Sequence, residues 1–347
     1  MSYLAKKLLY GLLVLVGVVI VVFFLFQGFG DPARLVLGQA GDSATIQNIR
    51  KELALDQPKW KQFVLYLNDV SPVAVHSAAD IEKKQLKGFF VGGENKLGIK
   101  LPYLRRSYQT KKDVGEVLLE ALPGTMVLAL AAMCIATVIG ILLGILAAVK
   151  QNTWLDTSSV FASVLGISAP SFFMGIVLAY LFGFVFSQYT GLHMTGSLYN
   201  IDPFTGKDLQ LRNLVLPAIT LGIRPLAIIT QLTRSSMLDV LDQDYIRTAY
   251  AKGLQKKTVI FRHALRNALN PVITAITGWF AELLAGAFFV EYIFGWKGIG
   301  KVTVDALEKL DFPVVMGSVL LTATFFIMVN ILADLLYGMV DPRVRVK

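Results

Sequence analysis

One cysteine and three histidines are all that the chain offers to a thiol-dependent or metal-dependent site. A single cysteine, Cys134, excludes an intramolecular disulfide, and its place inside an apolar run is typical of a small packing residue. The histidines, His76, His193 and His263, are scattered, with no metal-ligand cluster or nucleophile arrangement around them. We therefore predict no catalytic residue, no metal and no cofactor, and we do not expect an enzyme.

Charge is scarce as well. Charged residues make up 16% of the chain and hydrophobic residues 55%, with a mean hydropathy of +0.60. Soluble domains have about 25% charged residues. Residues 8–26, 121–149 and 157–201 contain no Asp, Glu, Lys or Arg. Each run can cross a bilayer, which takes about 20 residues. The composition thus excludes an ordinary soluble domain and predicts a polytopic membrane protein.

We predict an all-α membrane protein with six transmembrane helices and both termini in the cytoplasm. The predicted spans are approximately 8–27, 123–149, 158–186, 214–233, 268–290 and 313–337. Residues 1–30 contain the first helix, interpreted as retained because no small-x-small cleavage site follows Gly30. An extracytoplasmic segment, 31–120, precedes a five-helix core, 121–340, and a cytoplasmic tail, 341–347.

The net charge of +9 could indicate nucleic-acid binding, so its distribution matters. With six spans, the amino terminus, residues 150–156, the loop 234–266 and the tail share one side, with 13 basic and five acidic residues. The short loops on the other side, 187–212 and 291–311, hold five basic and six acidic residues. The positive-inside rule makes the first side cytoplasmic. Most of the excess charge then reflects topology, and we expect no nucleic-acid partner.

The extracytoplasmic segment is predicted to form a small folded cap. Residues 44–55 and 59–67 have helical hydrophobic spacing, and Pro58 separates them. From residue 69 to residue 98 the pattern weakens and Gly, Lys and Ser accumulate, which predicts a less regular insertion.

A chain that hydrolysed ATP itself would need a phosphate-binding loop. Residues 295–301 fit G-x-x-x-x-G-K, but Val302 stands where the magnesium-binding Ser or Thr belongs. The stretch also lies on the predicted outer side, away from cytoplasmic ATP. We interpret it as a glycine-rich turn.

The loop 234–266 is long for a membrane protein and has two helical patterns. A helix over 244–252 would end at Gly253, a suitable C-cap, and a second pattern runs from Lys257 towards Leu269 and ends before Pro271. One face of the first helix would carry Tyr245, Thr248, Ala249 and Lys252. Small residues there would admit another protein's surface closely, with Arg247, Lys252 and Arg262 available to acidic groups. The alternative is an amphipathic helix resting on anionic lipid.

This loop resembles the EAA loop of ABC importer permeases, because Arg247-Thr-Ala249 precedes Gly253 by six to four residues. The variant is that of the dipeptide and oligopeptide permease family, B-type subunit, and the resemblance covers nearly the whole chain. Further matches are Gly30-Asp-Pro-Ala33, Leu53-Ala-Leu-Asp56, Thr233-Arg-Ser-Ser-Met237, His263-Ala-Leu-Arg-Asn267, Glu291-Tyr-Ile-Phe294, Gly298-Ile-Gly300, Asn330 with Asp334, and Asp341-Pro-Arg343.

The resemblance implies a multi-pass subunit of the bacterial plasma (inner) membrane that moves peptides or a similar small solute inward. Implied partners are a homologous C-type permease subunit, two cytoplasmic ABC ATPase subunits that hydrolyse the ATP, an extracytoplasmic solute-binding protein, and membrane lipid. The loop would be the coupling helix in an ATPase cleft, with Gly253 as pivot. The coupling residues carried over are Asp244, Tyr245, Arg247, Thr248, Ala249, Lys252, Gly253, Leu254, Arg262 and His263.

Three residues depart from that family's pattern. Lys297 replaces a common proline in the outer turn, and Arg224 and Glu282 lie in predicted spans at positions expected to be uncharged. Charges in spans are costly, so the two should face the bundle interior or water. We hypothesise that they pair near the translocation path; alternatively, each reaches the interface from near a helix end. The alternative function is an ion-gradient-driven secondary transporter, which would need no coupling loop.

Overall fold

The computed structural model describes residues 3–27, 47, 50, 54–202 and 206–340. The chain divides into two compact units. Unit 1 comprises Met1–Lys7, Leu122–Lys301 and Phe325–Lys347, and unit 2 comprises Leu8–Ala121 and Val302–Thr324. The motifs at 30–33 and 341–343, and nearly all of the predicted helix at 44–55, lie outside the described residues.

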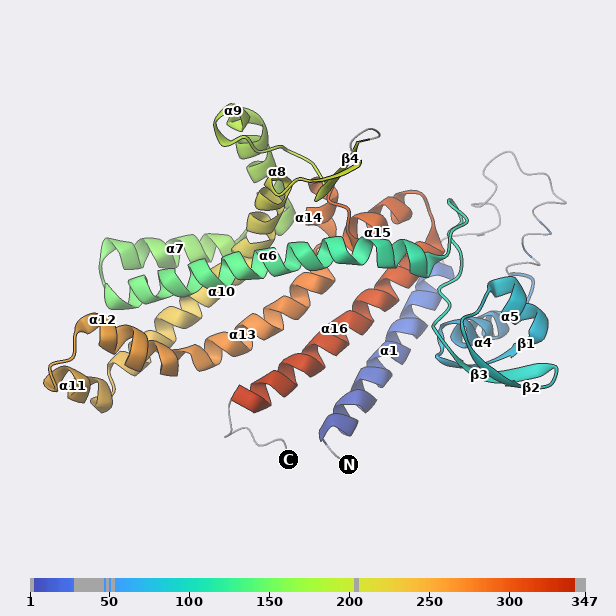
Figure 1. Cartoon of the computed structure of the whole chain (residues 1–347), viewed down its shortest axis with the longest axis horizontal. Helices are drawn as coiled ribbons and strands as arrows, with labels where there is room; N and C mark the ends of the chain where they lie inside the picture. The colour runs from blue at the N-terminus through green and yellow to red at the C-terminus, as the bar shows by residue number, and fades with distance from the viewer. Residues whose placement is uncertain (1–2, 28–46, 48–49, 51–53, 203–205, 341–347) are drawn as a thin grey trace. The chain divides into compact units, whose positions relative to one another are not determined.

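Long apolar helices dominate the described chain (Figure 1). Four of them are long and apolar enough to cross a membrane. These are α1 (Tyr3–Gln27), α6 (Val114–Val149), α10 (Arg212–Leu241) and α16 (Phe312–Val340). They coincide with the first, second, fourth and sixth predicted spans. The fifth predicted span corresponds to α13 (Leu265–Gly286), which is not among these four helices. The total of six spans therefore stays a prediction.

The third predicted span, 158–186, is not one straight helix. It consists of α7 (Trp154–Ser168) and α8 (Ser171–Tyr180), the latter continued by a π-helical turn, η2 (Leu181–Val185). The two halves are bent by 108° and together can form a broken span or a re-entrant loop. The break falls at Pro170, which has no backbone N–H and disfavours helical geometry at the preceding residue. The sharp turn between α7 and α8 is visible in Figure 1.

Close packing of α6 on α10 depends on two glycines one helical turn apart. A Cβ atom at Gly140 would lie 2.9 Å from a side-chain carbon of Ile229, and one at Gly144 would lie 2.5 Å from Cβ of Thr233. Small residues spaced in this way let helix backbones approach each other inside a membrane. The same pair of helices contributes Leu128, Ala132 and Ile229 to the main buried cluster of unit 1.

The expectation of an all-α fold is wrong in detail, because two small sheets accompany the helices. Unit 1 contains a hairpin of β4 (Tyr199–Asp202) and β5 (Gly206–Leu209). Unit 2 contains an antiparallel three-stranded sheet in the order β1-β3-β2. Its strands are β1 (Val73–Ser77), β2 (Gly88–Gly92) and β3 (Asn95–Lys100). The segment 69–98 is therefore ordered secondary structure, not the irregular insertion that we predicted.

Two short helices complete the compact part of unit 2. The predicted helix at 59–67 is confirmed as α4 (Lys59–Val70), and α5 (Ala78–Lys84) follows β1. Asp311 ties the chain after the sheet to the start of α16, since its carboxylate accepts hydrogen bonds from Ser107 Oγ (2.5 Å) and Tyr108 N (2.9 Å). The sequence separation of these partners is about 200 residues, so unit 2 is closed by a long-range contact.

Polarity in the sheet of unit 2 is reversed relative to a soluble domain. Alternate residues that point inward include His76 and Lys100, which are buried. The outward alternates are large, apolar and exposed, and the strand register sets them side by side. They are Val73, Val75, Phe89, Val91, Leu97 and Ile99. The usual pattern of half-buried strands buries the apolar face and leaves the polar face in water.

Candidate functional site

The predicted coupling loop is structured, and it forms a compact subdomain of unit 1. Its helix α11 (Asp244–Ala251) follows α10, and the chain then passes through α12 (Lys256–Thr258) and a π-helical turn, η3 (Val259–Ala264), into α13. Figure 1 shows α11 and α12 at the end of the molecule where α10 finishes and α13 begins. The helix predicted over 244–252 is therefore present with nearly the predicted bounds.

One side of α11 is anchored in a hydrophobic cluster. Ile246 and Ala249 are buried there with Met237 of α10 and Ile145 of α6. Spacing of three residues puts Ile246 and Ala249 on the same face of the helix. The anchoring joins α11 to the carboxyl-terminal ends of α6 and α10.

Gly253 ends α11 in a Schellman motif. Its φ of +78° is left-handed, the N–H of Leu254 donates to the carbonyl of Ala249 (3.3 Å), and the N–H of Gly253 donates to that of Tyr250 (2.9 Å). Among the residues that the structure describes, none beyond the two chain neighbours of Gly253 has an atom within 4 Å of the place that its Cβ would take. The glycine is therefore required by backbone conformation and not by crowding.

Most of the predicted coupling residues lie on the exposed side of this subdomain. The exposed ones are Asp244, Tyr245, Arg247, Thr248, Lys252, Gly253, Leu254 and Arg262, and His263 is partly exposed. Ala249 is the exception, because only 6% of its surface is exposed and it packs in the cluster. The prediction that Ala249 belongs to a contact face is thus corrected: its small size serves the packing of α11 against the long helices.

The second predicted helix does not end before Pro271. The chain turns through η3 and continues as α13 past that proline to Gly286. Proline in a helix interior removes one hydrogen bond, a defect that membrane helices tolerate. Within η3, Val259, Ile260 and Ala264 are buried, while Phe261 and Arg262 are exposed.

A side-chain hydrogen bond connects the exposed side of α11 to α13. The Asn267 amide donates to the phenol oxygen of Tyr245 at 3.1 Å and also to the carbonyl of His263 at 3.0 Å. Arg247 and Asp244 form an ion pair at 3.5 Å, but both side chains are largely in solvent, where such pairs contribute little.

A partly buried ion pair joins the first turn of α7 to α10 in unit 1. Asp156 accepts two hydrogen bonds from Arg234, from Nε at 2.5 Å and from Nη2 at 2.8 Å, and a third from the backbone N–H of Asn152 at 3.0 Å. Bidentate pairing of this kind fixes orientation as well as charge. Our sequence reasoning assigned both residues to the cytoplasmic side but missed the pair, because 78 residues separate the partners.

Arg224 and Glu282 are both exposed, and no ion pair joins them. The Arg224 guanidinium instead lies over the ring of Trp279, 5.5 Å from its centroid. A cation over an aromatic face is attracted by the ring quadrupole, by more when the pair is desolvated. The hypothesised pairing with Glu282 is therefore absent from the described structure.

The glycine-rich turn at 295–301 is filled by protein groups. Glu291, with 0% of its surface exposed, accepts hydrogen bonds from the N–H groups of Gly300 (2.7 Å) and Lys301 (3.2 Å) and from Thr125 Oγ1 (2.7 Å). Burial raises the pKa of its carboxyl to about 7. Because the carboxylate occupies the N–H groups at the start of α15 (Ile299–Glu308), they are not free to cradle a phosphate.

Lys297 stands at the position where the resemblance leads us to expect proline. The turn is nevertheless held by hydrogen bonds of its neighbours. The indole N–H of Trp296, also fully buried, donates to the carbonyl of Gly124 at 2.9 Å, and Ile299 N donates to Thr125 Oγ1 at 2.9 Å. These contacts hold the turn against α6.

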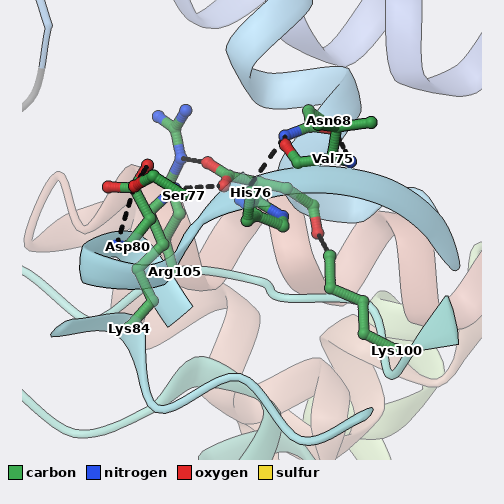
Figure 2. Close-up of polar contacts among 9 residues, drawn as sticks. Asn68, Val75, His76, Ser77, Asp80, Lys84, Lys100 and Arg105 are labelled. Atoms are coloured by element: carbon green, nitrogen blue, oxygen red, sulfur yellow. Dashed lines mark hydrogen bonds and ion pairs between the residues drawn. The ribbon is translucent and has the colours of Figure 1, made fainter. Parts of the chain in front are cut away.

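Unit 2 contains a cluster of charged side chains around the carboxylate of Asp69. Lys84 Nζ is 2.6 Å from it and Arg105 Nε is 3.2 Å from it, while Lys100 donates to the backbone carbonyl of Asp69. Figure 2 shows the three cations converging from α5, from β3 and from the chain after it. Burial lowers the pKa of Lys100 to about 8, despite the attraction of Asp69. Burial and the neighbouring lysines lower the pKa of His76.

This charged cluster in unit 2 is structural in character. Beside it, Asn68 accepts from the N–H of Val75 at 3.0 Å and donates to its carbonyl at 2.7 Å, whereas Nε2 of His76 is buried without a hydrogen-bond partner in the part of the chain that is described. Among the residues that the structure describes, no group of three His, Cys, Asp or Glu side chains could hold a metal ion.

Comparison with known families identifies the chain along almost its whole length. Residues 140–346 match the family described as binding-protein-dependent transport system inner membrane component. Residues 1–129 match the family of the N-terminal part of such membrane components.

Curated relatives are similar over the full length. The dipeptide transport system permease protein DppB of Alkalihalophilus pseudofirmus is 34% identical over 99% of this chain and 99% of its own. That of Escherichia coli strain K12 is 37% identical over 96% of this chain and 95% of its own. A solved structure, an inward-facing form of the MetNI methionine ABC transporter, aligns with a TM-score of 0.51 at 16% identity, covering 65% of this chain and 97% of its own. At that identity the likeness shows the fold alone.

Proposed function

The chain belongs to the family of binding-protein-dependent transport system inner membrane components, and from this we propose that it is the B-type permease subunit of an ATP-driven peptide importer. It is a multi-pass protein of the bacterial inner membrane. It provides the path for the solute, and separate ATPase subunits hydrolyse the ATP. The relatives' names support a dipeptide or a similar small peptide as solute.

The observation that carries the coupling role is the two-sided character of α11. One side is buried against the ends of α6 and α10 through Ile246 and Ala249. The other presents Tyr245, Thr248 and Lys252 to solvent. A helix that packs on the long helices and has an exposed outer side can bind a soluble subunit. A movement of that subunit would then displace the long helices.

Two side-chain contacts hold the proposed coupling region, α11 with the ends of α10 and α13, in place. Tyr245 is bonded to Asn267 at the start of α13, and Asp156 binds Arg234 at the end of α10. A neutral hydrogen bond such as that of Tyr245 is worth about 1 kcal/mol, whereas a hydrogen bond between charged groups is worth about 1.5–3 kcal/mol. We therefore assign the main mechanical link to the α7–α10 ion pair and a finer adjustment to Tyr245.

In the proposed assembly the chain spans the membrane six times with both termini in the cytoplasm. It pairs with a homologous C-type permease subunit, two ABC ATPase subunits and an extracytoplasmic solute-binding protein. ATP-driven closure of the ATPases draws the coupling helices together and switches the permease pair between inward-facing and outward-facing forms. The +8 balance of the cytoplasmic segments, 13 basic against five acidic residues, supports this orientation.

We further place Arg224 and Glu282 beside the translocation path. They lie on α10 and α13, two helices of unit 1, and both are exposed. Charges in a span are stable where they reach water or a polar partner. A peptide carries an ammonium and a carboxylate, to which a glutamate and an arginine are complementary.

Site-directed cross-linking tests the coupling role. Cys134→Ala removes the single thiol of this chain, and Lys252→Cys then carries a photoactivatable maleimide, attached before the chain is assembled with its partner subunits. We expect a cross-link to the ATPase subunit. Lys207→Cys, exposed in β5 and predicted on the opposite face, is the matched control and should give none. The coupling role is wrong if position 252 fails to cross-link or if position 207 gives the same product.

Uptake into proteoliposomes tests the transport class. Peptide uptake should require ATP and the binding protein, and a proton or sodium gradient alone should drive none. Uptake that follows an ion gradient without any ATPase subunit would establish the secondary-transporter alternative instead.

A further inference from the structure

Helix α4 in unit 2 carries an apolar stripe that its own domain only partly covers. Trp60, Phe63, Val64 and Leu67 follow the i, i+3, i+4, i+7 spacing of one helix face. Phe63 and Leu67 pack in the hydrophobic cluster of unit 2. Trp60 and Val64, in contrast, are 68% and 52% exposed. The uncovered part of the stripe is therefore at the amino-terminal end of α4.

The packing of α4 fixes its level along the first membrane helix. Phe63 lies 5.1 Å from Phe23 and 5.8 Å from Phe24, and Tyr66 stacks on Phe23 at 5.6 Å, measured between ring centroids. Phe23 and Phe24 belong to the last turn of the apolar stretch Ala5–Phe26. A helix held against the end of a span lies at the boundary between the hydrocarbon and the aqueous phase.

The lipid-facing surface of α1 continues onto α4. Val21, Phe24 and Leu25 are exposed on α1, and in a bilayer such residues contact acyl chains. Phe24 contacts Phe63, next to which Val64 is exposed on α4. Exposed apolar side chains therefore lie on α1 and on the part of α4 that adjoins it.

The polar residues of α4 are compatible with an apolar face that is directed towards lipid. Gln62 is buried, and its amide donates to the carbonyls of Leu55 (3.2 Å) and Gln57 (2.8 Å). Two lysines, Lys59 and Lys61, flank Trp60 and are exposed. Long cationic side chains beside a tryptophan are typical of the head-group region, where the charges reach phosphate and the rings remain at the apolar boundary.

We propose that α4 is an interfacial helix whose Trp60 and Val64 insert between the head groups and acyl chains of the outer leaflet. The insertion fixes unit 2 to the membrane surface at the outer end of α1. The proposal rests on the membrane location of the chain and is independent of which solute it carries.

Spin-label accessibility in the full importer, reconstituted in nanodiscs of phosphatidylethanolamine and phosphatidylglycerol, tests this insertion. On a Cys134→Ala background, a nitroxide is attached at Trp60→Cys or at Val64→Cys, the second of which keeps the tryptophan. Val21→Cys on α1 serves as the lipid reference. Glu82→Cys, exposed on α5, serves as the aqueous reference. Collision rates with oxygen, which enters lipid, and with a neutral nickel chelate, which stays in water, are compared.

We expect labels at positions 60 and 64 to collide several-fold more with oxygen, relative to nickel, than the label at position 82, and less so than the label at position 21. Equal ratios at 60, 64 and 82 would place α4 in water and overturn the proposal. Low collision rates with both reagents would show that a protein subunit covers the stripe, which also overturns it. ATP-dependent uptake measured on the same samples reports the proposed function separately.

Discussion

The phenol oxygen of Tyr245 on α11 accepts a hydrogen bond from the amide of Asn267, 3.1 Å away in the first turn of α13. The two residues are 22 positions apart, and the bond closes the loop formed by α11, α12 and η3. It links the exposed side of α11 to a long helix. The buried side has its own contacts through Ile246.

Removing this bond should weaken coupling without unfolding the subunit. Tyr245→Phe deletes the acceptor while keeping the ring, and a neutral hydrogen bond is worth about 1 kcal/mol, so we expect solute-stimulated ATP hydrolysis to fall about fivefold. The readout is the ratio of stimulated to basal hydrolysis by the reconstituted importer. Tyr250→Phe, on the same helix, is the matched control and should leave the ratio unchanged. Equal effects of the two changes would contradict the role of the bond.

The α6–α10 contact should not tolerate a single added methyl group. Gly144→Ala would put a Cβ 2.5 Å from that of Thr233, and overpacking of this kind costs about 1–3 kcal/mol. We expect a clear fall in the thermal midpoint in detergent. Gly17→Ala, on α1, meets nothing within 4 Å in the described part of the chain and should be neutral or slightly stabilising. A midpoint for Gly144→Ala equal to that of Gly17→Ala would show that the helices are not so close.

Breaking the Asp156–Arg234 pair should lower the stability of the subunit measurably. Asp156→Ala leaves the partly buried guanidinium of Arg234 without its carboxylate, a loss of about 1.5–3 kcal/mol. Thermal denaturation of the purified subunit measures it. Asp244→Ala removes a carboxylate from the exposed pair with Arg247 and is expected to change stability little. Restoration of part of the lost stability in the Asp156→Ala, Arg234→Met double variant would confirm that the unpaired charge is the cause.

Unit 2 should become more stable as the pH rises from about 8. The pKa of Lys100 is lowered from 10.5 to about 8 in the folded chain, because its charged form is buried. Between these values the unfolded state binds more protons than the folded state, so stability increases with pH. Relative to Lys100→Met, the thermal midpoint of the unaltered chain should therefore rise between pH 7.5 and pH 9.5. A difference that is constant over this interval would contradict the burial of a charged Lys100.

Sequence patterns predicted the elements whose cause is local. The uncharged runs located the long helices, the polarity of the short loops assigned their sides, and Gly253 marked the end of α11. The bend in the third span has an equally local cause at Pro170, which we did not use. The GxxxG spacing of Gly140 and Gly144 was also available as a signal for close helix packing.

What the sequence did not reveal depends on distant partners. Asp156 finds Arg234 and Thr125 finds Glu291 only once the helices are assembled. The sheet of unit 2 was not predicted because its inward positions hold polar residues such as His76 and Lys100. These residues reverse the alternation that a half-buried strand normally shows. Ala249 was misassigned because a small residue fits a contact face and a packed face equally well.

Gly253 offers the most direct test of the central claim that α11 and its turn transmit ATPase movement into the membrane helices. With φ at +78° and open space around it, this position accepts asparagine but strains valine, whose branched side chain disfavours left-handed backbone. The measurement is ATP hydrolysis by the assembled importer with and without solute-loaded binding protein. We predict that Gly253→Val assembles normally yet loses the stimulation, while Gly253→Asn keeps most of it. Full stimulation in the valine variant would contradict the account.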